Sequence, residues 1–288
     1  MNLIIGTGAG AFSLEAPNEP SIGGTGINHI ARNGDSWWAV DGKGRLHRDG
    51  EQAAQGPADV TLNCVLQTDD TTWIGAGEAR LFRLDGDQLV EDDGFAGAPG
   101  RDGWYTPWGG PPDVRSMAAD SEGTLFINVH VGGILRYDNE GLSPTLDQDA
   151  DVHQVIADST RTGTVLAACA RGLAQSADGM VFGYRADGLH ASYCRAVALV
   201  NDTILLSAST GPWSKQARIY RGDITSGSFQ PCTDGLPEWF EENLDSHCLA
   251  VLDGVAFAGQ GDTVWRSEDE GVSWTEAGSG FPRITCLA

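Results

Sequence analysis

The sequence predicts an all-β fold built from seven repeated units of four short strands, and three observations support this. The 288 residues include 39 Gly and 12 Pro, and short β-rich runs alternate with Gly-, Asp- and Asn-containing turns. One four-strand pattern recurs about every 41 residues, a spacing within the range of propeller repeats. The two ends of the chain supply complementary parts of one such unit. We therefore predict a seven-bladed β-propeller of four-stranded antiparallel blades, formed as a single domain by residues 1–288.

Each unit begins with an inner strand that is short and mostly apolar. The seven inner strands are expected to begin at Ile27, Leu62, Val114, Val152, Cys194, His247 and Ile284. Cys64, Cys248 and Cys286 occupy matching positions of three of these strands, and the sequence has no C-x-x-C spacing. The cysteines are therefore interpreted as small buried side chains rather than as a zinc or redox site.

The second and third strands follow each inner strand after short turns. Second strands are expected at residues 36–40, 72–75, 124–128, 164–168, 203–207 and 255–258. Third strands are expected at residues 44–47, 80–83, 133–137, 172–176, 217–220 and 263–266. One unit alone buries too little apolar surface to be stable, whereas a closed ring buries each sheet between its neighbours.

The last strand, at residues 284–288, has no following strands with which to form a blade. A single terminal strand would leave an unpaired edge, which proteins usually avoid. Residues 2–14 read as two strands without an inner strand before them. We predict that the C-terminal strand pairs with these N-terminal strands and closes the ring.

The segment Ser267-x-Asp269-x-Gly271-x-x-Trp274 indicates a strand, a turn and a second strand. Asp269 can accept hydrogen bonds from turn amides, and Gly271 can adopt a positive φ. This segment resembles the Asp-box of the BNR-repeat β-propellers, a group that includes sialidase-like and photosystem-assembly-factor-like proteins. A degenerate version, Ser176-Ala-Asp178-Gly179, lies in an earlier unit. The resemblance implies the propeller architecture and a structural role for these turns.

The catalytic motifs of sialidases have no counterpart here. Those enzymes carry an arginine triad, an R-I-P motif, a Tyr/Glu nucleophile pair and an acid–base Asp. The chain has no R-I-P segment, and Arg32, Arg115, Arg195 and Arg283 do not match the triad. No catalytic residue is therefore transferred from the resemblance, because a fold alone does not specify an activity.

The charge of the chain excludes some classes of partner. Its formal net charge is −22, and no basic patch is apparent. This argues against a nucleic-acid or anionic-membrane partner. The N-terminus lacks the basic and apolar regions of a signal peptide, and no apolar run approaches the length of a membrane span. A cytoplasmic location is expected.

Propeller topology places three features on one face: the starts of the inner strands, the loops before them, and the loops between second and third strands. The loop at residues 95–113 is too long for a plain connection and is rich in aromatic residues and proline. The candidate aromatic and imidazole side chains of this face are Trp104, Tyr105, Trp108, His130, His190 and Trp239. We interpret them as the wall of a central pocket; the alternative is a lid that packs on itself.

Polar residues recur at the start of inner strands with one spacing. The pairs are Asp113/Arg115, Asp151/His153 and Asp245/His247, and Arg195 occupies a comparable position in another unit. Side chains two residues apart lie on one face of a strand. The pattern predicts a polar site for a small anionic or polyhydroxylated, carbohydrate-like ligand, or for a loop of a partner protein. Alternatively, these residues only cap strand ends.

The preferred hypothesis is therefore a non-catalytic binding propeller. The alternative is a hydrolase or lyase in which His153 or His247 acts as general base, oriented by Asp151 or Asp245. Such an enzyme could be metal-assisted, since imidazoles and carboxylates together suit several divalent ions. No cofactor is predicted, and a divalent metal stays an open alternative. A third hypothesis is an assembly scaffold.

Overall fold

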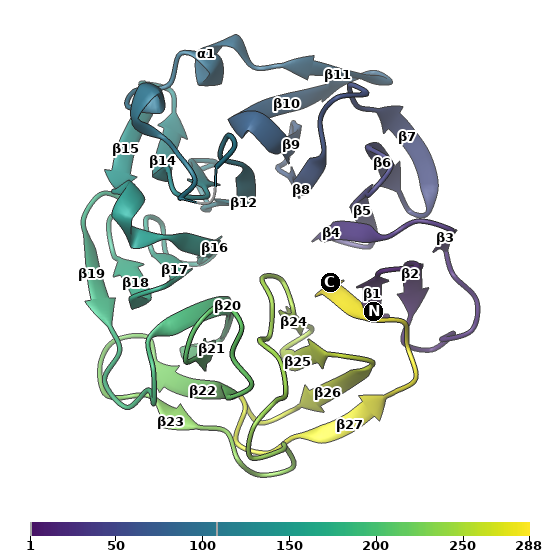
Figure 1. Ribbon diagram of the computed structural model, residues 1–288, viewed down its shortest axis with the longest axis vertical. Coiled ribbons are helices and arrows are strands. Elements are labelled where there is room, and N and C mark those ends of the chain that lie inside the picture. The colour runs from purple at the N-terminus through teal and green to yellow at the C-terminus, as the bar shows by residue number, and fades with distance from the viewer. Residues whose placement is uncertain (1, 108) are drawn as a thin grey trace. The chain divides into compact units, whose positions relative to one another are not determined.

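The computed structural model describes residues 2–107 and 109–288, and these residues form seven four-stranded antiparallel sheets (Figure 1). The chain is a seven-bladed β-propeller, as predicted, with almost no helix. Within the described residues, no helix is long and apolar enough to cross a membrane.

The chain divides into two compact units, which are described separately. The terminal unit comprises Met1–Ile27, Ala168–Ala174 and Tyr184–Ala288, and the central unit comprises Asn28–Ala167 and Gln175–Gly183. The single domain expected over residues 1–288 stays a prediction.

The central unit contains two complete sheets and a third that is complete except for Ile27, the first residue of β4. Their strands are β4 (Ile27–Asn33), β5 (Ser36–Asp41), β6 (Arg45–Arg48) and β7 (Glu51–Gln55); β8 (Leu62–Gln67), β9 (Thr72–Ala76), β10 (Arg80–Asp85) and β11 (Gln88–Glu91); and β12 (Val114–Ala119), β13 (Leu125–Val129), β14 (Gly133–Asp138) and β15 (Gly141–Leu146). The short helix α1 (Asp93–Ala96) and the 3-10 turns η1 (Gly77–Ala79), η2 (Arg101–Gly103) and η3 (Gln148–Ala150) lie in the connections.

The terminal unit contains three complete sheets. Their strands are β28 (Ile284–Leu287), β1 (Ile4–Thr7), β2 (Gly10–Ser13) and β3 (Ile22–Gly23); β20 (Tyr193–Val200), β21 (Thr203–Ser209), β22 (Ala217–Asp223) and β23 (Gln230–Pro231); and β24 (Leu249–Leu252), β25 (Val255–Gln260), β26 (Thr263–Ser267) and β27 (Thr275–Gly278). The seventh sheet consists of β16 (Val152–Ala157), β17 (Val165–Cys169), β18 (Gly172–Ser176) and β19 (Phe182–Arg185), whose residues are divided between the two units.

Five inner strands begin at the predicted residue, and β20 begins one residue early, at Tyr193. The prediction was wrong at His247, because β24 begins only at Leu249. His247 has a φ of 67°, in the left-handed region, and a residue in this conformation cannot continue an extended strand. The chain therefore turns at His247 before the strand starts.

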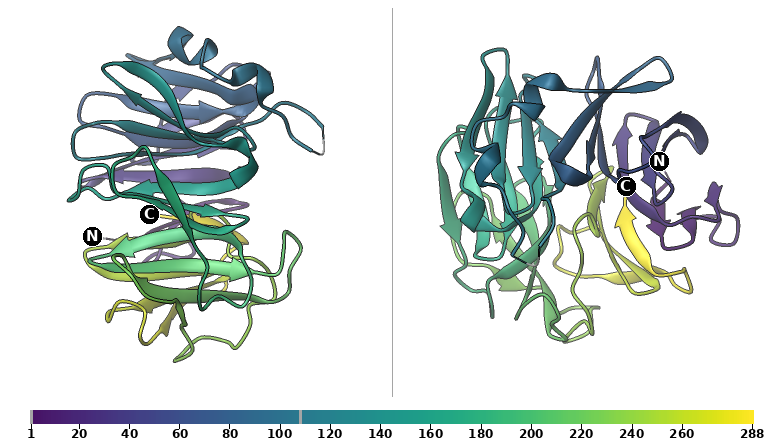
Figure 2. Two further views of the ribbon diagram at one scale, coloured as in Figure 1. Left: turned by 90° about the vertical axis from the view of Figure 1, so that its left-hand side faces the viewer. Right: turned by 45° about the horizontal axis from the view of Figure 1, so that its top comes forward.

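The two ends of the chain share one sheet, as predicted. The strand order is β28-β1-β2-β3, β28 and β1 lie side by side in Figure 1, and the two ends of the chain lie close together in Figure 2. The amide of Ile4 donates to the carbonyl of Ala288 at 2.7 Å, and the amide of Ala288 donates back at 3.0 Å. Both edges of β1 are therefore paired, which removes the exposed strand edge that each end would otherwise leave.

The matching cysteines lie opposite glycines of the neighbouring strand. Cys64 pairs with Gly75, and Cys286 pairs with Gly6. A Cβ added to Gly6 would lie 2.3 Å from the Cys286 Sγ, so the thiol fills the space that the glycine leaves. All six cysteines are buried and free, and burial raises the pKa of Cys64 to about 12. These positions are packing sites, as the sequence suggested.

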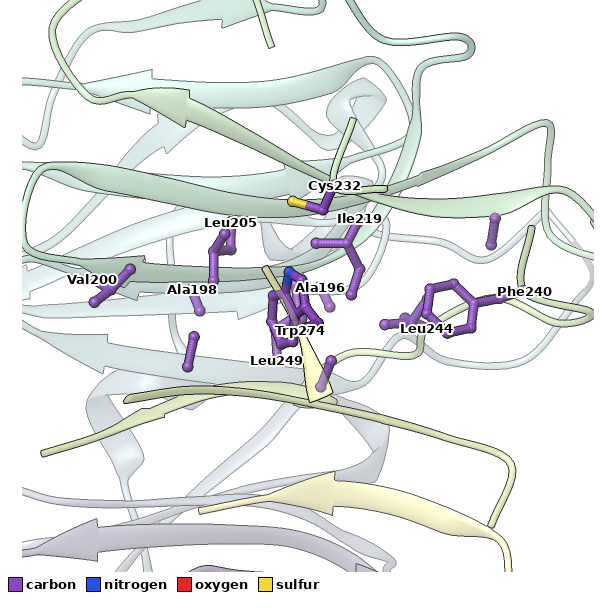
Figure 3. Packing of buried hydrophobic residues seen from close by; sticks show 13 residues of the cluster. Ala196, Ala198, Val200, Leu205, Ile219, Cys232, Phe240, Leu244, Leu249 and Trp274 are labelled. Carbon is purple, nitrogen blue, oxygen red and sulfur yellow. The ribbon is translucent and has the colours of Figure 1, made fainter. Parts of the chain in front are cut away.

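The Asp269 turn has the hydrogen bonds that its sequence predicts. The Asp269 carboxylate accepts from the amide of Ser273 at 2.9 Å and from its hydroxyl at 2.6 Å, and Gly271 has a φ of 81°. The indole of Trp274 donates to the Gly271 carbonyl at 3.2 Å and is buried in an apolar cluster with Leu205 and Cys232 (Figure 3). The turn thus places Trp274 in the core, which is a structural role.

Candidate functional site

Two histidines and a carboxylate of the central unit lie within reach of one another. His130 follows β13, Asp151 precedes β16, and His153 lies on β16. One donor atom from each of these three residues can be chosen so that all three atoms lie within 4.8 Å of one another. We call His130, Asp151 and His153 the His–Asp–His cluster. The sequence predicted all three residues as site residues, and the structure brings them together.

The carboxylate of Asp151 lies between the two imidazoles. Its Oδ1 is 3.2 Å from His130 Nε2, and its Oδ2 is 3.8 Å from His153 Nε2. The pKa of Asp151 lies below its usual value, because the contact with His130 and the charges of His153 and Arg115 outweigh burial. His153 is 1% exposed, whereas His130 and Asp151 are partly accessible. The cluster therefore has a buried side and an open side.

Asp151 reaches this place through an unusual backbone conformation. Its φ of 49° and ψ of 66° lie in the left-handed region, which costs a non-glycine residue about 1–2 kcal/mol. The predicted strand-face geometry therefore does not apply to Asp151 and His153, since Asp151 is not part of the strand. Left-handed residues at such positions are often found at functional sites.

Arg115, another predicted site residue, contacts the same imidazole. Its Nη1 lies 3.1 Å from His130 Nε2. A guanidinium can only donate and a carboxylate can only accept, so one imidazole nitrogen cannot satisfy both Arg115 and Asp151. In the described part of the chain, the buried Oδ1 of Asp151 accepts no well-formed hydrogen bond. Nε2 of His130 therefore lies between a donor, Arg115 Nη1, at 3.1 Å and an acceptor, Asp151 Oδ1, at 3.2 Å.

Ser116 and Asn128, two polar residues that the sequence analysis did not select, hold the strand that carries His153. The amide of Asn128 donates to Ser116 Oγ at 3.0 Å and to the carbonyl of Val152 at 3.2 Å. Ser116 in turn accepts from the amide of Val155 at 3.0 Å. Ser116 and Asn128 are fully buried, so these bonds hold the start of β16 against β12 and β13. The available signal was two polar residues at buried positions of apolar strands.

Asp113 adds a second carboxylate near Arg115 and His130. The amide of His130 donates to the carbonyl of Asp113 at 2.8 Å, which fixes the loop after β13 beside the start of β12. Burial raises the pKa of Asp113, although the charges of His130 and Arg115 partly oppose this. Carboxylates, imidazoles and one guanidinium therefore meet at one end of these strands.

The residues of the predicted aromatic wall in the central unit are Trp104, Tyr105 and Trp108, and their ligand-binding role stays a prediction. Trp104 packs on Phe95 with ring centroids 6.0 Å apart, and the Arg101 guanidinium lies 5.3 Å from its ring. It packs on the apolar core of this unit, and its Cγ lies 3.1 Å from where a Cβ on Gly132 would stand. Tyr105 is 50% exposed, and Trp108 lies outside the described residues.

In the terminal unit, Asp245 and Arg195 form an ion pair. Arg283 lies 3.9 Å from the same carboxylate, and the ring of Tyr193 lies 5.5 Å from the Arg195 guanidinium. The described partners of Asp245 are thus arginines, whereas the sequence paired it with His247. A catalytic role for Asp245 and His247 and a ligand-binding role for Arg195 stay predictions.

His190 and Trp239 form a separate group in the same unit. His190 Nδ1 lies 2.8 Å from the Tyr220 hydroxyl, and His190 Nε2 lies 3.1 Å from the Gln216 carbonyl. Trp239 packs edge-on against His190 and carries the Arg218 guanidinium over its ring at 4.0 Å. Burial lowers the pKa of His190, and its two nitrogens already have protein partners. This arrangement resembles a packed loop more than a binding surface.

An open cleft of about 540 Å³ lies at the opposite end of β12 from the cluster. Its lining includes Trp73 and Tyr137 together with the carboxylates of Asp69, Glu122 and Asp138. Turns of this kind were predicted to be structural, and Asp138 accepts a hydrogen bond from the amide of Glu140 at 2.8 Å. The cleft and the His–Asp–His cluster are therefore separate features.

Comparisons with known proteins support the fold. Neither a protein-family model nor a curated protein matches the sequence. Virginiamycin B lyase from Staphylococcus aureus superposes with a TM-score of 0.64 at 13% identity, covering 90% of this chain and 84% of the lyase. A putative 6-phosphogluconolactonase from Bacteroides uniformis gives 0.62 at 11% identity, covering 100% and 98%.

The WD40 propeller domain of Doa1 also gives a TM-score of 0.62, at 15% identity, with 86% of this chain and 81% of that domain covered. At such low identities the comparisons establish the seven-bladed propeller and no activity. Membership of the BNR family is not confirmed by them. The function must therefore be argued from the residues of the site.

Proposed function

We propose that this propeller is a binding protein for a small polar ligand, and that its binding site is the His–Asp–His cluster holding a divalent metal ion. One observation carries the proposal: two imidazoles and a carboxylate converge within 4.8 Å, and a buried oxygen of that carboxylate accepts no well-formed hydrogen bond among the described residues. A cation would accept electron pairs from the nitrogen and the oxygen that now face each other.

The spacing of the ligand atoms supports the proposal. Zn²⁺ binds imidazole nitrogen and carboxylate oxygen at about 2.0–2.2 Å, which places neighbouring ligands of a tetrahedral site about 3.4 Å apart. The two imidazoles contact different oxygens of Asp151, Oδ1 at 3.2 Å and Oδ2 at 3.8 Å, and one ligand atom from each residue lies within 4.8 Å of the others, so the three side chains are near enough to close around one ion. Small side-chain movements would complete the site. Two imidazoles with one carboxylate favour a first-row transition ion over Mg²⁺ or Ca²⁺.

Three protein ligands leave at least one coordination position open on the accessible side of the cluster. A polar ligand, anionic or polyhydroxylated, would take this position. The same open position would suit a metal-bound water, so a metal-assisted hydrolase or lyase is the second candidate. Turnover of activated ester and phosphoester substrates that requires His153 would favour this second candidate over simple binding.

The test is calorimetric titration of Zn²⁺, with Mg²⁺ for comparison, into chelator-treated protein. We expect one Zn²⁺ per chain, and we expect Asp151→Asn and His153→Gln each to weaken binding by at least about tenfold, since even outer partners of metal ligands matter this much. His47→Gln is the matched control, because His47 also contacts a buried carboxylate, that of Asp41, at 3.0 Å.

The control should bind Zn²⁺ as the wild type does. Circular dichroism and thermal unfolding would show that each variant is folded. Wild-type Zn²⁺ affinity in folded Asp151→Asn and His153→Gln proteins would overturn the proposal, and so would the absence of binding in the wild type.

A further inference from the structure

The charges around the His–Asp–His cluster do not by themselves favour an anion. By formal charge, with histidine counted as neutral, Asp113 and Asp151 contribute −2 and Arg115 contributes +1, and the whole chain carries −22. A divalent ion would change the local sum from −1 to +1. An anionic ligand would then meet a net positive site in an otherwise acidic protein, so the metal decides which class of ligand can bind.

Arg115 contacts His130, one of the proposed metal ligands, directly. Its guanidinium donates to the Nε2 lone pair of His130 across 3.1 Å, and Nε2 is also the atom that lies nearest Asp151. A metal ion bound to that nitrogen needs the same lone pair. Arg115 and the metal therefore compete for one atom, and the arginine must leave Nε2 when the ion binds.

We propose that Arg115 is a metal-displaced anion clamp: it holds His130 Nε2 in the metal-free chain and turns to a carboxylate or phosphate group of the ligand when the ion takes its place. This inference rests on the proposed metal site and names the class of its ligand. The displaced guanidinium stays next to the ion, positively charged and with donors in a planar fork that fits carboxylate and phosphate oxygens.

The mechanism couples two binding events. The ion releases the guanidinium, so the anion binds better to the metal-loaded chain than to the metal-free chain. By linkage the anion must strengthen metal binding by the same factor, which for coupled sites is typically about fivefold or more. Arg115 thus weakens metal binding when no anion is present and contributes to anion binding when the metal is present.

The experiment uses the full chain, Zn²⁺ as the metal and methylphosphonate as the anion probe. Zn²⁺ affinity is measured in wild type and Arg115→Ala without the anion, and methylphosphonate is then titrated into the Zn²⁺-loaded and metal-free forms of each. Arg136→Ala is the control for loss of one positive charge, because Arg136 pairs with Asp138 on β14.

We expect Arg115→Ala to bind Zn²⁺ more tightly than wild type, by about twofold to tenfold, which is the range for losing one competing hydrogen bond. We expect methylphosphonate to bind the Zn²⁺-loaded wild type at least about fivefold more tightly than the metal-free form, and this ratio to vanish in Arg115→Ala. Arg136→Ala should keep both wild-type properties.

The outcomes separate the two proposals. If Zn²⁺ does not bind to wild type or to Arg115→Ala, the metal site itself is wrong. If Zn²⁺ binds but Arg115→Ala binds it no more tightly, or keeps the wild-type anion ratio, the clamp is wrong while the metal site stands. A Zn²⁺-loaded wild type that ignores methylphosphonate also overturns the clamp.

Discussion

The contact between Gly6 and Cys286 allows a quantitative test of how the chain ends are joined. Gly6 lies on β1 opposite Cys286 of β28, and an added Cβ would lie 2.3 Å from Sγ and 3.1 Å from Ile27 Cγ2. Carbon atoms in favourable contact are about 3.5–4.0 Å apart. Gly6→Ala must therefore push β28 away from β1 or force the thiol aside.

The expected cost combines two opposite effects. Overpacking of a close-packed core costs about 1–3 kcal/mol. Replacement of glycine by alanine restricts the unfolded chain and returns about 0.4–1 kcal/mol. Gly6→Ala should therefore lower the free energy of unfolding by up to about 2.6 kcal/mol, and each kcal/mol corresponds to about 2–4 °C in Tm for a chain of roughly this size.

Cys286→Ala removes the sulfur that the new methyl group meets. The double variant should therefore be more stable than the sum of the two single changes predicts, with a coupling energy of at least about 1 kcal/mol. Gly183→Ala is the matched control, since its Cβ would meet no atom within 4 Å. Denaturant unfolding of all five proteins measures these values. Additive effects of Gly6→Ala and Cys286→Ala would show that the two residues are not in contact and would refute the reasoning.

Three further predictions concern the Asp269 turn. Gly271→Ala should destabilise the chain by about 1–3 kcal/mol more than Gly280→Ala. Both glycines have a positive φ, but only a Cβ on Gly271 would lie 2.6 Å from Leu205 Cδ2. Equal losses of stability in denaturant unfolding would contradict this prediction. Hydrogen bonds from Ser273 lower the pKa of Asp269 from 3.8 to about 2. The ionised carboxylate therefore contributes to the free energy of unfolding above about pH 4, and this contribution is lost as the pH falls toward 2. The wild type should lose stability over this range more steeply than Asp269→Asn, and parallel stability curves would contradict the prediction. Trp274→Phe should cost about 0.5–1.5 kcal/mol for the lost indole hydrogen bond, in addition to the packing loss, and an unchanged Tm would argue against a structural role.

The strands were predictable from the sequence because their signals are local. Period-two alternation and Gly- or Asp-containing turns determine where a strand can begin and end. The pairing of β28 with β1 is not local, but an unpaired strand at one end and an incomplete unit at the other made it the simplest solution. His247 was mispredicted because its left-handed φ depends on how the chain turns into β24, which composition does not show.

The candidate site was predictable only in part. Arg115, Asp151 and His153 were chosen as polar residues at the start of inner strands, and His130 as an imidazole of a loop between second and third strands; the structure places the four together. The reason given was wrong for Asp151, whose left-handed conformation places its carboxylate between two imidazoles. The ligand-binding role of Trp104 stays a prediction: an aromatic residue in a long loop can cover a core as well as line a pocket, and sequence alone does not distinguish the two.

The most informative feature of the sequence was a pair of polar residues that do not fit the apolar pattern of their strands. Ser116 and Asn128 are polar residues in strands that are otherwise apolar and buried, and burying such groups is costly unless they are hydrogen-bonded. The Asn128 amide nitrogen and the Ser116 hydroxyl are bonded to each other and to β16, and these bonds hold the segment that carries Asp151 and His153. Two buried polar residues on neighbouring apolar strands therefore indicate a place where side-chain hydrogen bonds fix an adjacent segment. Here that segment is the start of β16, which carries His153 and follows Asp151 of the His–Asp–His cluster.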